Sequence, residues 1–323
     1  MGAQPLERSA LITLTRAEIE QLIDLPSAAE AILESYRSAS LGRVNLPPVG
    51  HIVFPDQDAD CHIKYGHLQG DTHFVIKIAT GFPHNPGQGL PTGNGMVLVM
   101  SATTGTVTAL LHDEMLLTDV RTGLGGAIAS RLLARSDAKQ LLVVGTGVQA
   151  RWQIKSHCAL LPHIERITLW GRNPDKAQLV IDELAPQLAI ANATNLSDAV
   201  AQADIIVTAT GATSPLIAAD WVQPGTHITA VGADAPGKQE LAIDLVTKAD
   251  LHIADLVAQC VDHGEFAHAV AAGHIDATRL VELGLLIENP ALGRTDPTQI
   301  TIADLTGIAA QDIAMANAIL RRL

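Results

Sequence analysis

The spacing of apolar residues changes twice along the chain, and each change marks a different kind of element. Residues 15–41 place apolar positions at helical spacing, with Thr15 as the predicted N-cap and Glu18 as its capping-box partner. Two short helices that break near Pro26 are therefore predicted. Between residues 49 and 113 the apolar runs become short and are separated by Asp, Gly and Gln, a pattern typical of antiparallel strands. The first third of the chain is expected to be a sheet covered by helices.

After residue 118 the apolar period becomes helical, and strands and helices then alternate as far as residue 257. Such alternation predicts an α/β fold with a doubly wound parallel sheet. The predicted strands lie at residues 140–145, 166–171, 204–211, 226–232 and 251–255. Helical segments are expected from there to residue 298, followed by a closing helix at 301–323 that returns to the first domain. The predicted domains are residues 1–120 together with 300–323, and residues 121–299.

The composition argues against several classes of protein. Of the 323 residues, 47% are hydrophobic and 17% are charged, which is unlike a chain that is disordered by default. The formal net charge is −13 and there is no run of Lys or Arg, so neither nucleic acid nor an anionic membrane is expected as the main partner. The N-terminal segment lacks an apolar signal region and no long apolar stretch follows it, which predicts a cytoplasmic protein.

A glycine-rich turn joins the first predicted strand of the parallel sheet to the helix after it. The strand QLLVVG leads into Gly145, Gly147 and Ala150, which form a G-x-G-x-x-A pattern. The first glycine allows a tight turn, the second lets the backbone approach a pyrophosphate, and the alanine permits close packing of helix on strand. Because a helix N-terminus also attracts phosphates, this pattern in this context predicts a dinucleotide site.

The end of the next strand determines which dinucleotide is expected. Sites that select NAD usually end this strand in Asp or Glu, which binds the ribose 2′-hydroxyl, whereas this strand ends in Gly171, Arg172 and Asn173. A guanidinium can pair with a 2′-phosphate, so NADP(H) is the preferred cofactor, and NAD(H) stays open. In the alternative interpretation Arg172 stacks on the adenine and both cofactors are accepted.

Three charged residues stand where a bound anion or a reacting atom would explain them. Lys77 lies in an apolar strand, where its desolvation is costly unless it meets an anion; a solvated surface position is the alternative. Arg121 falls in the first turn of a predicted helix, where a cation opposes the helix dipole, so a carboxylate partner is expected from a ligand or from an acid such as Asp119. Asp234 follows a strand at the edge where α/β sheets bind ligands, and either transfers a proton or caps a helix.

The segments that carry these residues resemble one protein family. IKIATGFPHNPGQGLPT, LLTDVRTGLGGAIASRLLA, LLVVGTGVQAR and AVGADAPGKQEL are similar, in this order and over most of the chain, to the ornithine cyclodeaminase/μ-crystallin family. The resemblance implies a homodimer with a Rossmann dinucleotide-binding domain and a mixed α+β domain that binds substrate and forms the dimer interface. It also implies activities such as cyclodeamination of ornithine or lysine, dehydrogenation of alanine, and reduction of imino acids.

The resemblance further implies roles for individual residues. Lys77 and Arg121 correspond to residues that bind the substrate carboxylate, and Asp234 corresponds to the acid beside the reacting carbon. Arg43 resembles a further substrate-binding arginine, and Thr92 resembles a residue that lines the pocket. With the two residues at the end of the second strand included, the positions expected to bind the cofactor are Gly145, Gly147, Val148, Gln149, Arg172, Asn173, Thr210, Gly211, Val231 and Gly232.

Two departures from the ornithine enzymes of the family favour net reduction. The stretch VGHIVFP offers no acid for the distal ammonium of ornithine unless the alignment shifts to Asp56, and Gly-Arg-Asn replaces the acid that binds the ribose. The predicted reaction is therefore NAD(P)H-dependent reduction of a small cyclic imino acid, Δ1-pyrroline-2-carboxylate to L-proline. Lys77 or a water held by Asp234 would protonate the imine nitrogen. Ornithine cyclodeamination and a μ-crystallin-like binding protein without turnover remain the alternatives.

Thirteen histidines raise the question of a metal site. The two groups that attract attention are His62, His67 and His73, and Asp262, His263 and His268. Their spacings repeat no known ligand pattern, so no metal is expected. The stretch TGLGGAIAS lacks a preceding parallel strand and is predicted to be a helix whose small residues let another element pack closely.

Overall fold

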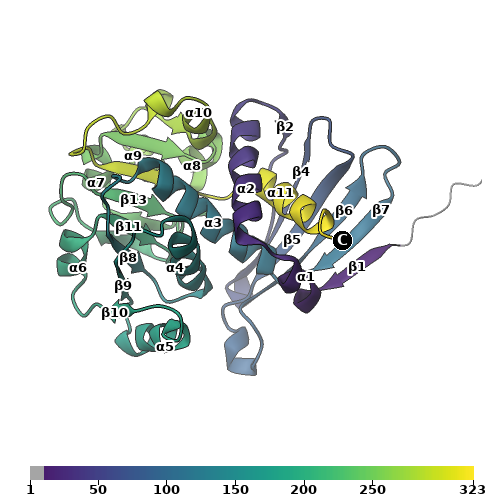
Figure 1. Ribbon diagram of the computed structural model, residues 1–323, viewed down its shortest axis with the longest axis horizontal. Helices are drawn as coiled ribbons and strands as arrows, with labels where there is room; N and C mark the ends of the chain where they lie inside the picture. The colour runs from purple at the N-terminus through teal and green to yellow at the C-terminus, as the bar shows by residue number, and fades with distance from the viewer. Residues whose placement is uncertain (1–10) are drawn as a thin grey trace, which may run out of the picture.

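The computed structural model describes residues 11–323, so the first ten residues of the predicted first domain lie outside the described part of the chain. The described residues form two large sheets with helices packed on them (Figure 1). A mixed sheet of seven strands is built from the N-terminal third, and a parallel sheet of eight strands is built from the rest of the chain. The predicted α/β fold class is confirmed by this arrangement.

The seven-stranded sheet is antiparallel except for one parallel pair, β1 with β7. Its order is β1-β7-β6-β5-β4-β2, and β3 also pairs with β4. The antiparallel strands predicted between residues 49 and 113 are confirmed. In this sheet Lys64 of β4 lies directly opposite Lys77 of β5. The strands are β1 (Ile12–Thr15), β2 (Val44–Asn45), β3 (Gly50–Phe54), β4 (Ala59–Leu68), β5 (His73–Gly81), β6 (Gly93–Ser101) and β7 (Val107–His112).

Three helices, α1 (Arg16–Leu22), α2 (Leu25–Ser40) and α11 (Ala309–Leu320), belong to this half of the molecule. The predicted capping box is present, because the Glu18 carboxylate accepts a 2.8 Å hydrogen bond from the backbone N–H of Thr15. Pro26 lies in the first turn of α2, where a missing N–H costs nothing, so the chain breaks just before it. The C-terminal α11 packs on β4 and β5 beside α2 (Figure 1).

The eight-stranded sheet is entirely parallel, with the order β10-β9-β8-β11-β13-β17-β15-β16. The chain runs outward from β8 to β10 and then crosses to β11, so the topological switch lies between β8 and β11, where such sheets bind ligands. The strands are β8 (Gln140–Val144), β9 (Arg166–Trp170), β10 (Ile190–Asn192), β11 (Ile205–Thr208), β13 (His227–Ala230), β15 (Leu251–Ala254), β16 (Val281–Glu282) and β17 (Thr301–Asp304). A small separate sheet pairs β12 (Thr213–Ile217) with β14 (Gln239–Leu241).

Helices alternate with the strands of the parallel sheet. They are α4 (Val148–Leu160), α5 (Pro174–Leu184), α6 (Leu196–Gln202), α7 (Ile243–Lys248), α8 (Val257–His263), α9 (Ala267–Ala271) and α10 (Leu283–Glu288). Single 3₁₀ turns occur at Pro55–Gln57, Asn85–Gln88, Ala277–Arg279 and Pro290–Leu292. The result is the doubly wound architecture that the alternating pattern predicted.

The predicted closing helix is present and returns to the first domain, but it is shorter than 301–323, and the chain leaves the second domain after the predicted boundary at residue 300. Thr301–Asp304 form β17, a fully buried strand between β13 and β15, and the helix begins only at Ala309. A strand that is buried on both faces loses the alternation of apolar and polar residues, so the four residues look like the start of the helix that follows. The chain leaves the parallel sheet after Asp304, and residues 305–308 connect it to α11.

The helix α3 (Leu116–Leu133) joins the two halves and is buried along most of its length. It packs against α4, and a Cβ atom at Gly123 would lie 2.7 Å from the carbonyl oxygen of Trp152. A Cβ atom at Gly126 would lie 2.2 Å from the amide oxygen of Gln153. The prediction that the small residues of this stretch allow close packing is therefore confirmed.

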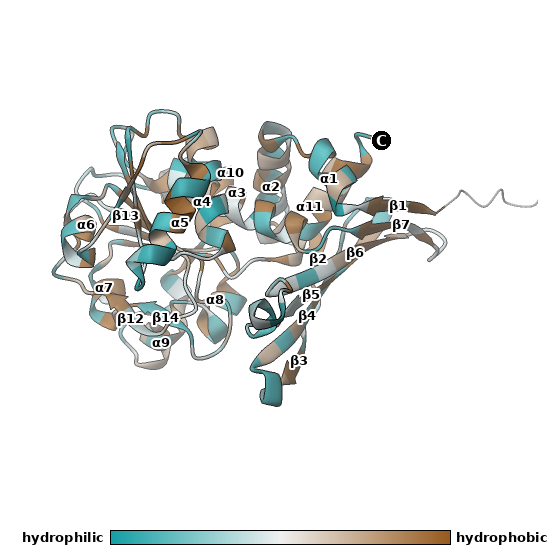
Figure 2. Ribbon diagram, turned by 90° about the horizontal axis from the view of Figure 1, so that it is seen from below, coloured by the Kyte–Doolittle hydropathy of each residue, from teal (hydrophilic) through white to brown (hydrophobic). Residues whose placement is uncertain are grey.

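The core is aliphatic, as the low aromatic content of 3% requires. Figure 2 shows apolar residues concentrated on strands such as β1, β6 and β7, with polar residues on the outer surfaces of the helices. No helix formed by residues 11–323 is long and apolar enough to cross a membrane.

Candidate active site

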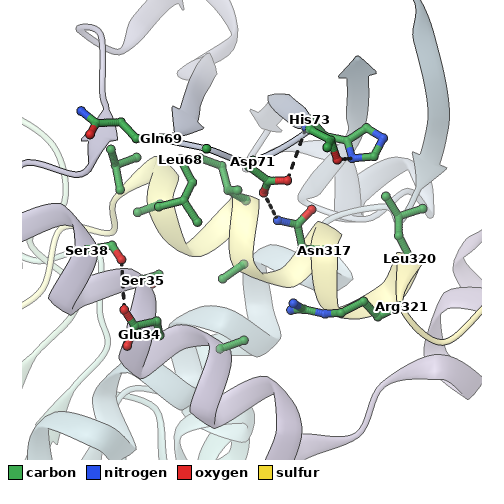
Figure 3. Close-up of a pocket in the computed structure, with 17 residues that line it drawn as sticks. Glu34, Ser35, Ser38, Leu68, Gln69, Asp71, His73, Asn317, Leu320 and Arg321 are labelled. Atoms are coloured by element: carbon green, nitrogen blue, oxygen red, sulfur yellow. Dashed lines mark hydrogen bonds between the residues drawn. The ribbon is translucent and has the colours of Figure 1, made fainter. Parts of the chain in front are cut away.

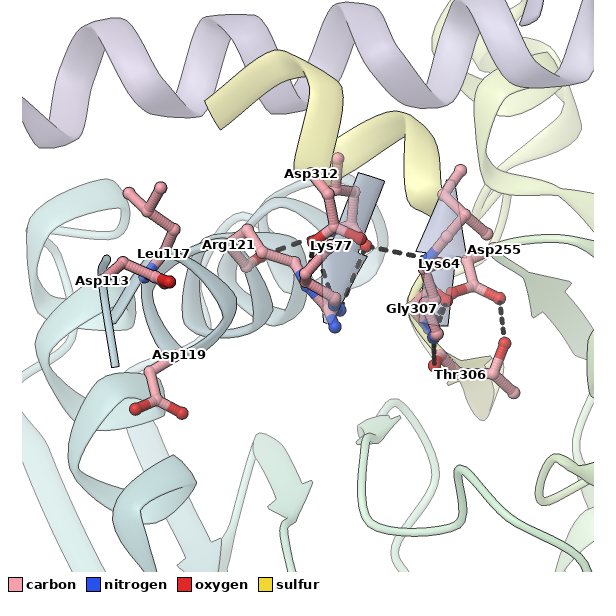
Figure 4. Close-up of polar contacts among 12 residues, drawn as sticks. Lys64, Lys77, Asp113, Leu117, Asp119, Arg121, Asp255, Thr306, Gly307 and Asp312 are labelled. Atoms are coloured by element: carbon pink, nitrogen blue, oxygen red, sulfur yellow. Dashed lines mark hydrogen bonds and ion pairs between the residues drawn. The ribbon is translucent and has the colours of Figure 1, made fainter. Parts of the chain in front are cut away.

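Lys77 and Arg121 meet at a carboxylate that the sequence analysis did not select. The Nζ atom of Lys77, on β5, donates a 3.1 Å hydrogen bond to Oδ1 of Asp312, on α11. The Nε atom of Arg121, on α3, lies 3.5 Å from the same oxygen (Figure 4). Residues from three distant segments thus form one group. Arg121 therefore has an internal acidic partner, as the alternative interpretation expected, but that acid is Asp312 and not Asp119, which lies apart from this group (Figure 4).

This group is almost completely buried and not fully paired. The side chains of Lys77 and Asp312 are 4% and 3% exposed, and that of Arg121 is 8% exposed. The Nε atom of Arg121 and the Oδ2 atom of Asp312 have no hydrogen-bond partner. Unpaired buried polar atoms are costly, so a polar ligand that pairs with them would stabilise this group.

Burial lowers the pKa of Lys77 to about 7, and the neighbouring charges of Arg121 and Lys64 act in the same direction. The carboxylate of Asp312 opposes this shift because it stabilises the charged ammonium. At neutral pH the amine of Lys77 is therefore divided between its charged and neutral forms. A group in that condition can both give and take a proton.

Lys64 belongs to the same group and was missed. Its Nζ atom donates a 2.6 Å hydrogen bond to the carbonyl oxygen of Gly307, in the segment that connects β17 to α11. Asp255 fixes this segment from the other side, accepting from the N–H of Gly307 at 2.6 Å and from the hydroxyl of Thr306 at 3.1 Å. Burial and the charge of Arg121 lower the pKa of Lys64. Its apolar neighbours in CHIKY gave the same signal that selected Lys77.

Asp234 faces a cavity of about 470 Å³ between the two halves of the molecule. The cavity is lined by Lys64 and His62 of β4, by the loop after β13 that carries Asp234, and by α8. Asp234 pairs with Lys238 at 2.5 Å and is 45% exposed. Partial desolvation opposes its ionisation, but Lys238, Lys64 and His62 together hold its pKa below the usual value. No helix begins at Asp234, so the capping alternative does not apply.

A second cavity, of about 770 Å³, lies on another part of the molecule, between α2, α11 and the β4–β5 hairpin (Figure 3). Two of the residues that line it are joined by a 2.6 Å hydrogen bond, which the side-chain amide of Asn317 donates to the carboxylate of Asp71. The residues that line it include neither Lys64 nor Asp234, which both line the smaller cavity. Size alone therefore does not select this cavity as the active site.

The glycine turn has the geometry that the predicted dinucleotide site requires. Gly145 has φ of +130°, and a Cβ atom there would lie 2.4 Å from the carbonyl oxygen of Ala209, so only glycine fits. Gly147 precedes α4 in extended backbone, and a Cβ atom there would meet no atom within 4 Å. Val148 opens α4 and is exposed. The turn therefore leaves free space directly before the N-terminus of a helix.

The expected cofactor positions after β11 and β13 are tied together by Glu240, which sequence reasoning missed. Its Oε1 atom accepts hydrogen bonds of 2.7 Å from the N–H and the hydroxyl of Thr210, and its Oε2 atom accepts one of 3.0 Å from the N–H of Gly232. Burial raises the pKa of Glu240, against the effect of these bonds. Val231, next to Gly232, is buried, and a Cβ atom at Gly211 would meet no atom within 4 Å.

One hydrogen bond connects the glycine turn to the helix of Arg121. The side-chain amide of Gln149, in the first turn of α4, donates to Asp119 of α3 at 3.0 Å. Burial raises the pKa of Asp119 to about 6, although this hydrogen bond opposes the shift. Because Arg121 lies half a turn further along α3, the basic cluster and the glycine turn are held in a fixed relation.

Arg172 and Asn173 stand at the end of β9, beside the glycine turn. The N–H of Gly145 donates to the carbonyl of Trp170 at 2.9 Å, and a Cβ atom at Gly171 would lie 2.3 Å from a methyl carbon of Thr146. The Arg172 side chain is exposed. Asn173 caps α5, accepting from the N–H of Asp175 at 2.9 Å, so its side chain has a structural role.

Three residues considered in the sequence analysis are not brought to this group. Arg43 is exposed at the turn after α2, where its carbonyl accepts a hydrogen bond from the N–H of Gln69. Gln69 follows the end of β4 and is five residues from Lys64, which is roughly 16 Å of extended chain. Thr92 is exposed on the β5–β6 connection, opposite Phe82. Asp56 is exposed at the tip of the β3–β4 hairpin. The substrate-binding expectation for Arg43 is therefore not kept.

Comparisons with known proteins agree with this architecture. The model of the ornithine cyclodeaminase/mu-crystallin family matches residues 10–323. A protein of Sinorhizobium fredii that is named an uncharacterized cyclodeaminase is 38% identical over 315 residues, which cover 96% of this chain and 95% of the relative.

Two solved structures are similar over nearly the whole chain. An archaeal alanine dehydrogenase, a dimer with bound NAD, superposes with a TM-score of 0.88 at 30% identity, covering 97% of this chain and 95% of that one. The Δ1-pyrroline-2-carboxylate reductase of Thermococcus litoralis, in complex with NADH and L-proline, gives a TM-score of 0.90 at 25% identity and covers 97% of both chains.

Proposed function

Because the chain belongs to the ornithine cyclodeaminase/mu-crystallin family, we propose that it is an NAD(P)H-dependent reductase of a small cyclic imino acid. The substrate we propose is Δ1-pyrroline-2-carboxylate, and the product is L-proline. The observation that carries this proposal is the convergence of Lys77 and Arg121 on one buried point, with Lys64 beside them. The Thermococcus reductase, which binds NADH and L-proline, supports it.

The substrate carboxylate is the natural ligand of this group. Three basic side chains surround Asp312, so one further anion lowers the electrostatic cost of the buried cluster. Arg121 offers a planar guanidinium, the donor geometry that suits a carboxylate. Held in this way, the imine carbon has a fixed position relative to the cofactor, and such positioning is a large contribution to the rate of a reaction between two bound molecules.

Lys77 is the proposed proton donor to the imine nitrogen. Its pKa of about 7 places the charged form within reach of neutral pH. Asp234, in the cavity wall, is the proposed residue that holds water near the reacting atoms. Lys77 and Asp234 are therefore the proposed catalytic residues, and Arg121 is the proposed carboxylate-binding residue. Thr92 stays a proposed pocket-lining residue on the family resemblance alone, since its side chain is exposed on the β5–β6 connection.

The cofactor supplies the hydride when it is bound. The free space at Gly147, the N-terminus of α4 and the tight turn at Gly145 fit the pyrophosphate of a dinucleotide. The remaining proposed contacts come from the positions beside the turn and after the neighbouring strands, namely Val148, Gln149, Arg172, Asn173, Thr210, Gly211, Val231 and Gly232. Solved relatives bind NAD or NADH. NADP(H) preference is our proposal and depends on Arg172.

The test is a panel of substrates with the purified full-length chain. Oxidation of NADPH or NADH is followed by absorbance with Δ1-pyrroline-2-carboxylate, its six-membered homologue and open-chain imino acids formed from 2-keto acids and amines. We expect the five-membered cyclic imine to give the highest kcat/KM, with L-proline as the product. No turnover with any imine, combined with tight NADPH binding, would instead indicate a binding protein like μ-crystallin.

Ornithine cyclodeamination is the second candidate, because the Sinorhizobium relative is named a cyclodeaminase. That reaction regenerates its cofactor, so it would release ammonia from L-ornithine in the presence of catalytic amounts of NAD⁺. The exposed position of Asp56 leaves it unable to meet the distal ammonium of ornithine in a buried site. Ammonia release measured beside the imine assay distinguishes the two reactions.

Replacing Gly147 with alanine is expected to weaken NAD(P)H binding without destabilising the fold. A methyl group at this position meets no protein atom within 4 Å, and the backbone angle is one that alanine adopts readily. It would, however, occupy the space proposed for the pyrophosphate, so we expect the Kd to rise by about tenfold or more. Gly145→Ala is the contrasting variant, in which steric overlap should also lower Tm. Unchanged cofactor affinity in Gly147→Ala would contradict the site.

Replacing Arg172 with alanine is expected to separate the two cofactors. Loss of a charged hydrogen bond to the 2′-phosphate should raise the Kd for NADPH by about 10- to 100-fold and change the Kd for NADH by less than about twofold. Arg166→Ala, at the exposed start of the same strand, is the matched control. If the Kd values for NADPH and NADH rose equally, Arg172 would contact the adenine, which both cofactors share, and not the 2′-phosphate.

We also propose that the protein forms a homodimer. The archaeal alanine dehydrogenase relative is described as a dimer. At one edge of the seven-stranded sheet the apolar side chains of Leu11, Ile12 and Val107 are exposed. Sedimentation analysis of the purified chain measures the assembly directly.

A further inference from the structure

Two histidines and an aspartate converge at the wall of the cavity that contains Asp234. His51 of β3 lies directly opposite His62 of β4, and Asp60 is two residues before His62, on the same face of the strand. One ligand atom from each of the three residues lies within 4.8 Å of the other two. This group shares only His62 with the two groups of histidines considered in the sequence analysis. His67 is an odd number of residues from His62, so it points to the opposite face of β4.

The distances in this group match the edges of a metal coordination shell. The Nε2 atoms of His62 and His51 lie 3.3 Å and 3.5 Å from the same oxygen, Oδ2 of Asp60. With metal–ligand bonds near 2.1 Å, two ligands of a tetrahedral ion are about 3.4 Å apart. The Nε2 atom of His62 is buried and has no hydrogen-bond partner, so the pair with Asp60 is a convergence of atoms rather than a formed hydrogen bond.

We propose that His51, Asp60 and His62 bind a divalent transition-metal ion, with Zn²⁺ as the expected ion. Two imidazoles and one carboxylate are a usual ligand set for zinc, and they leave one coordination position open. His51 and His62 line the cavity, so the open position faces the space beside Asp234. A nitrogen or oxygen atom of a small molecule in the cavity can complete the coordination.

The surroundings allow a cation to bind here. The three side chains are 25% to 39% exposed, so an ion has access from solvent. Burial lowers the pKa of His62, which keeps its imidazole neutral and able to coordinate. Lys64 lies on the same face of β4 and its charge opposes the ion, but its amine is turned to the carbonyl of Gly307. The carboxylate of Asp234 acts in the opposite sense.

The experiment measures metal binding to the full-length, untagged chain without substrate or cofactor, so its outcome does not depend on the proposed reductase activity. Co²⁺ is titrated as the spectroscopic probe, and Zn²⁺ is then added as the competitor. We expect the visible d–d absorption of a low-coordinate Co²⁺ site at about one equivalent, its loss on addition of Zn²⁺, and a rise in Tm with Zn²⁺.

Three variants make the assignment specific. His51→Ala and His62→Ala should each weaken Zn²⁺ binding by at least about tenfold. His67→Ala, on the other face of β4, is the matched control and should bind as the unaltered chain does. Thermal denaturation without metal reports whether each variant is folded. The absence of a Co²⁺ band in the unaltered chain, or a band that survives both His51→Ala and His62→Ala, would overturn the proposal.

Discussion

Arg121→Leu is expected to lower kcat/KM for the imino acid by about 10³-fold or more, and to leave the Kd for NADPH within about twofold. The guanidinium is 8% exposed and lies 3.5 Å from Asp312, so its loss removes a buried donor to the proposed substrate carboxylate. The substitution also leaves Asp312 with only Lys77 as a direct ion-pair partner. Because the substrate is then held less firmly over the cofactor, both KM and kcat should change.

Two further measurements separate the loss of substrate binding from a loss of the fold. Arg121→Lys retains the charge but loses the planar pair of donors, so its activity should fall between those of the leucine variant and the unaltered enzyme. Circular dichroism and Tm test whether the buried cluster still folds, since Gly307 packs directly on the guanidinium. If Arg121→Leu were folded but no longer bound NADPH, Arg121 would belong to the cofactor site and its proposed role as the carboxylate-binding residue would be wrong.

The residues of the glycine turn could be predicted because their geometry is local. Gly145 must adopt a positive φ where β8 meets α4, and both elements can be read from the chain within a few residues of it. The group formed by Lys77, Arg121 and Asp312 could not be predicted, because its geometry is not local. Lys77 and Arg121 carried a signal, a charge without a visible partner, but the partner Asp312 lies 235 residues from Lys77 in the sequence. Only the return of α11 over the first sheet brings them together.

The exact residue at which the chain returns to the first half, near residue 300, could not be predicted, because the signal there is also not local. β17 is buried on both faces, and its sequence TIAD runs without a break of pattern into the segment before α11. Lys64 could have been predicted as a site residue, because CHIKY places one lysine among apolar neighbours, as the strand of Lys77 does. Arg43, by contrast, was expected to bind substrate although its own segment gives no such signal. It was assigned by resemblance alone, and no pattern in its own segment requires a buried cation.

The pH dependence of reduction is expected to follow the protonation of Lys77. Burial lowers its pKa to about 7, and only the charged amine can give a proton to the imine. The rate should therefore fall as pH rises through about 7, because the fraction of charged Lys77 decreases in that direction. Lys77→Met should remove this limb and lower kcat by about 10²- to 10⁴-fold. The measurement is kcat/KM against pH at saturating NADPH.

Two neighbours of Lys77 should move this limb in opposite directions. Asp312 stabilises the charged amine, so Asp312→Asn should shift the limb to lower pH; Lys64 destabilises it, so Lys64→Met should shift the limb to higher pH. Neither shift is expected if Lys77 serves only to hold the fold together, because a purely structural lysine does not set the pH at which turnover fails. An alkaline limb that stays at the same pH in both variants would show that another group gives the proton, with the solvent-facing Asp234 and its water as the next residue to test.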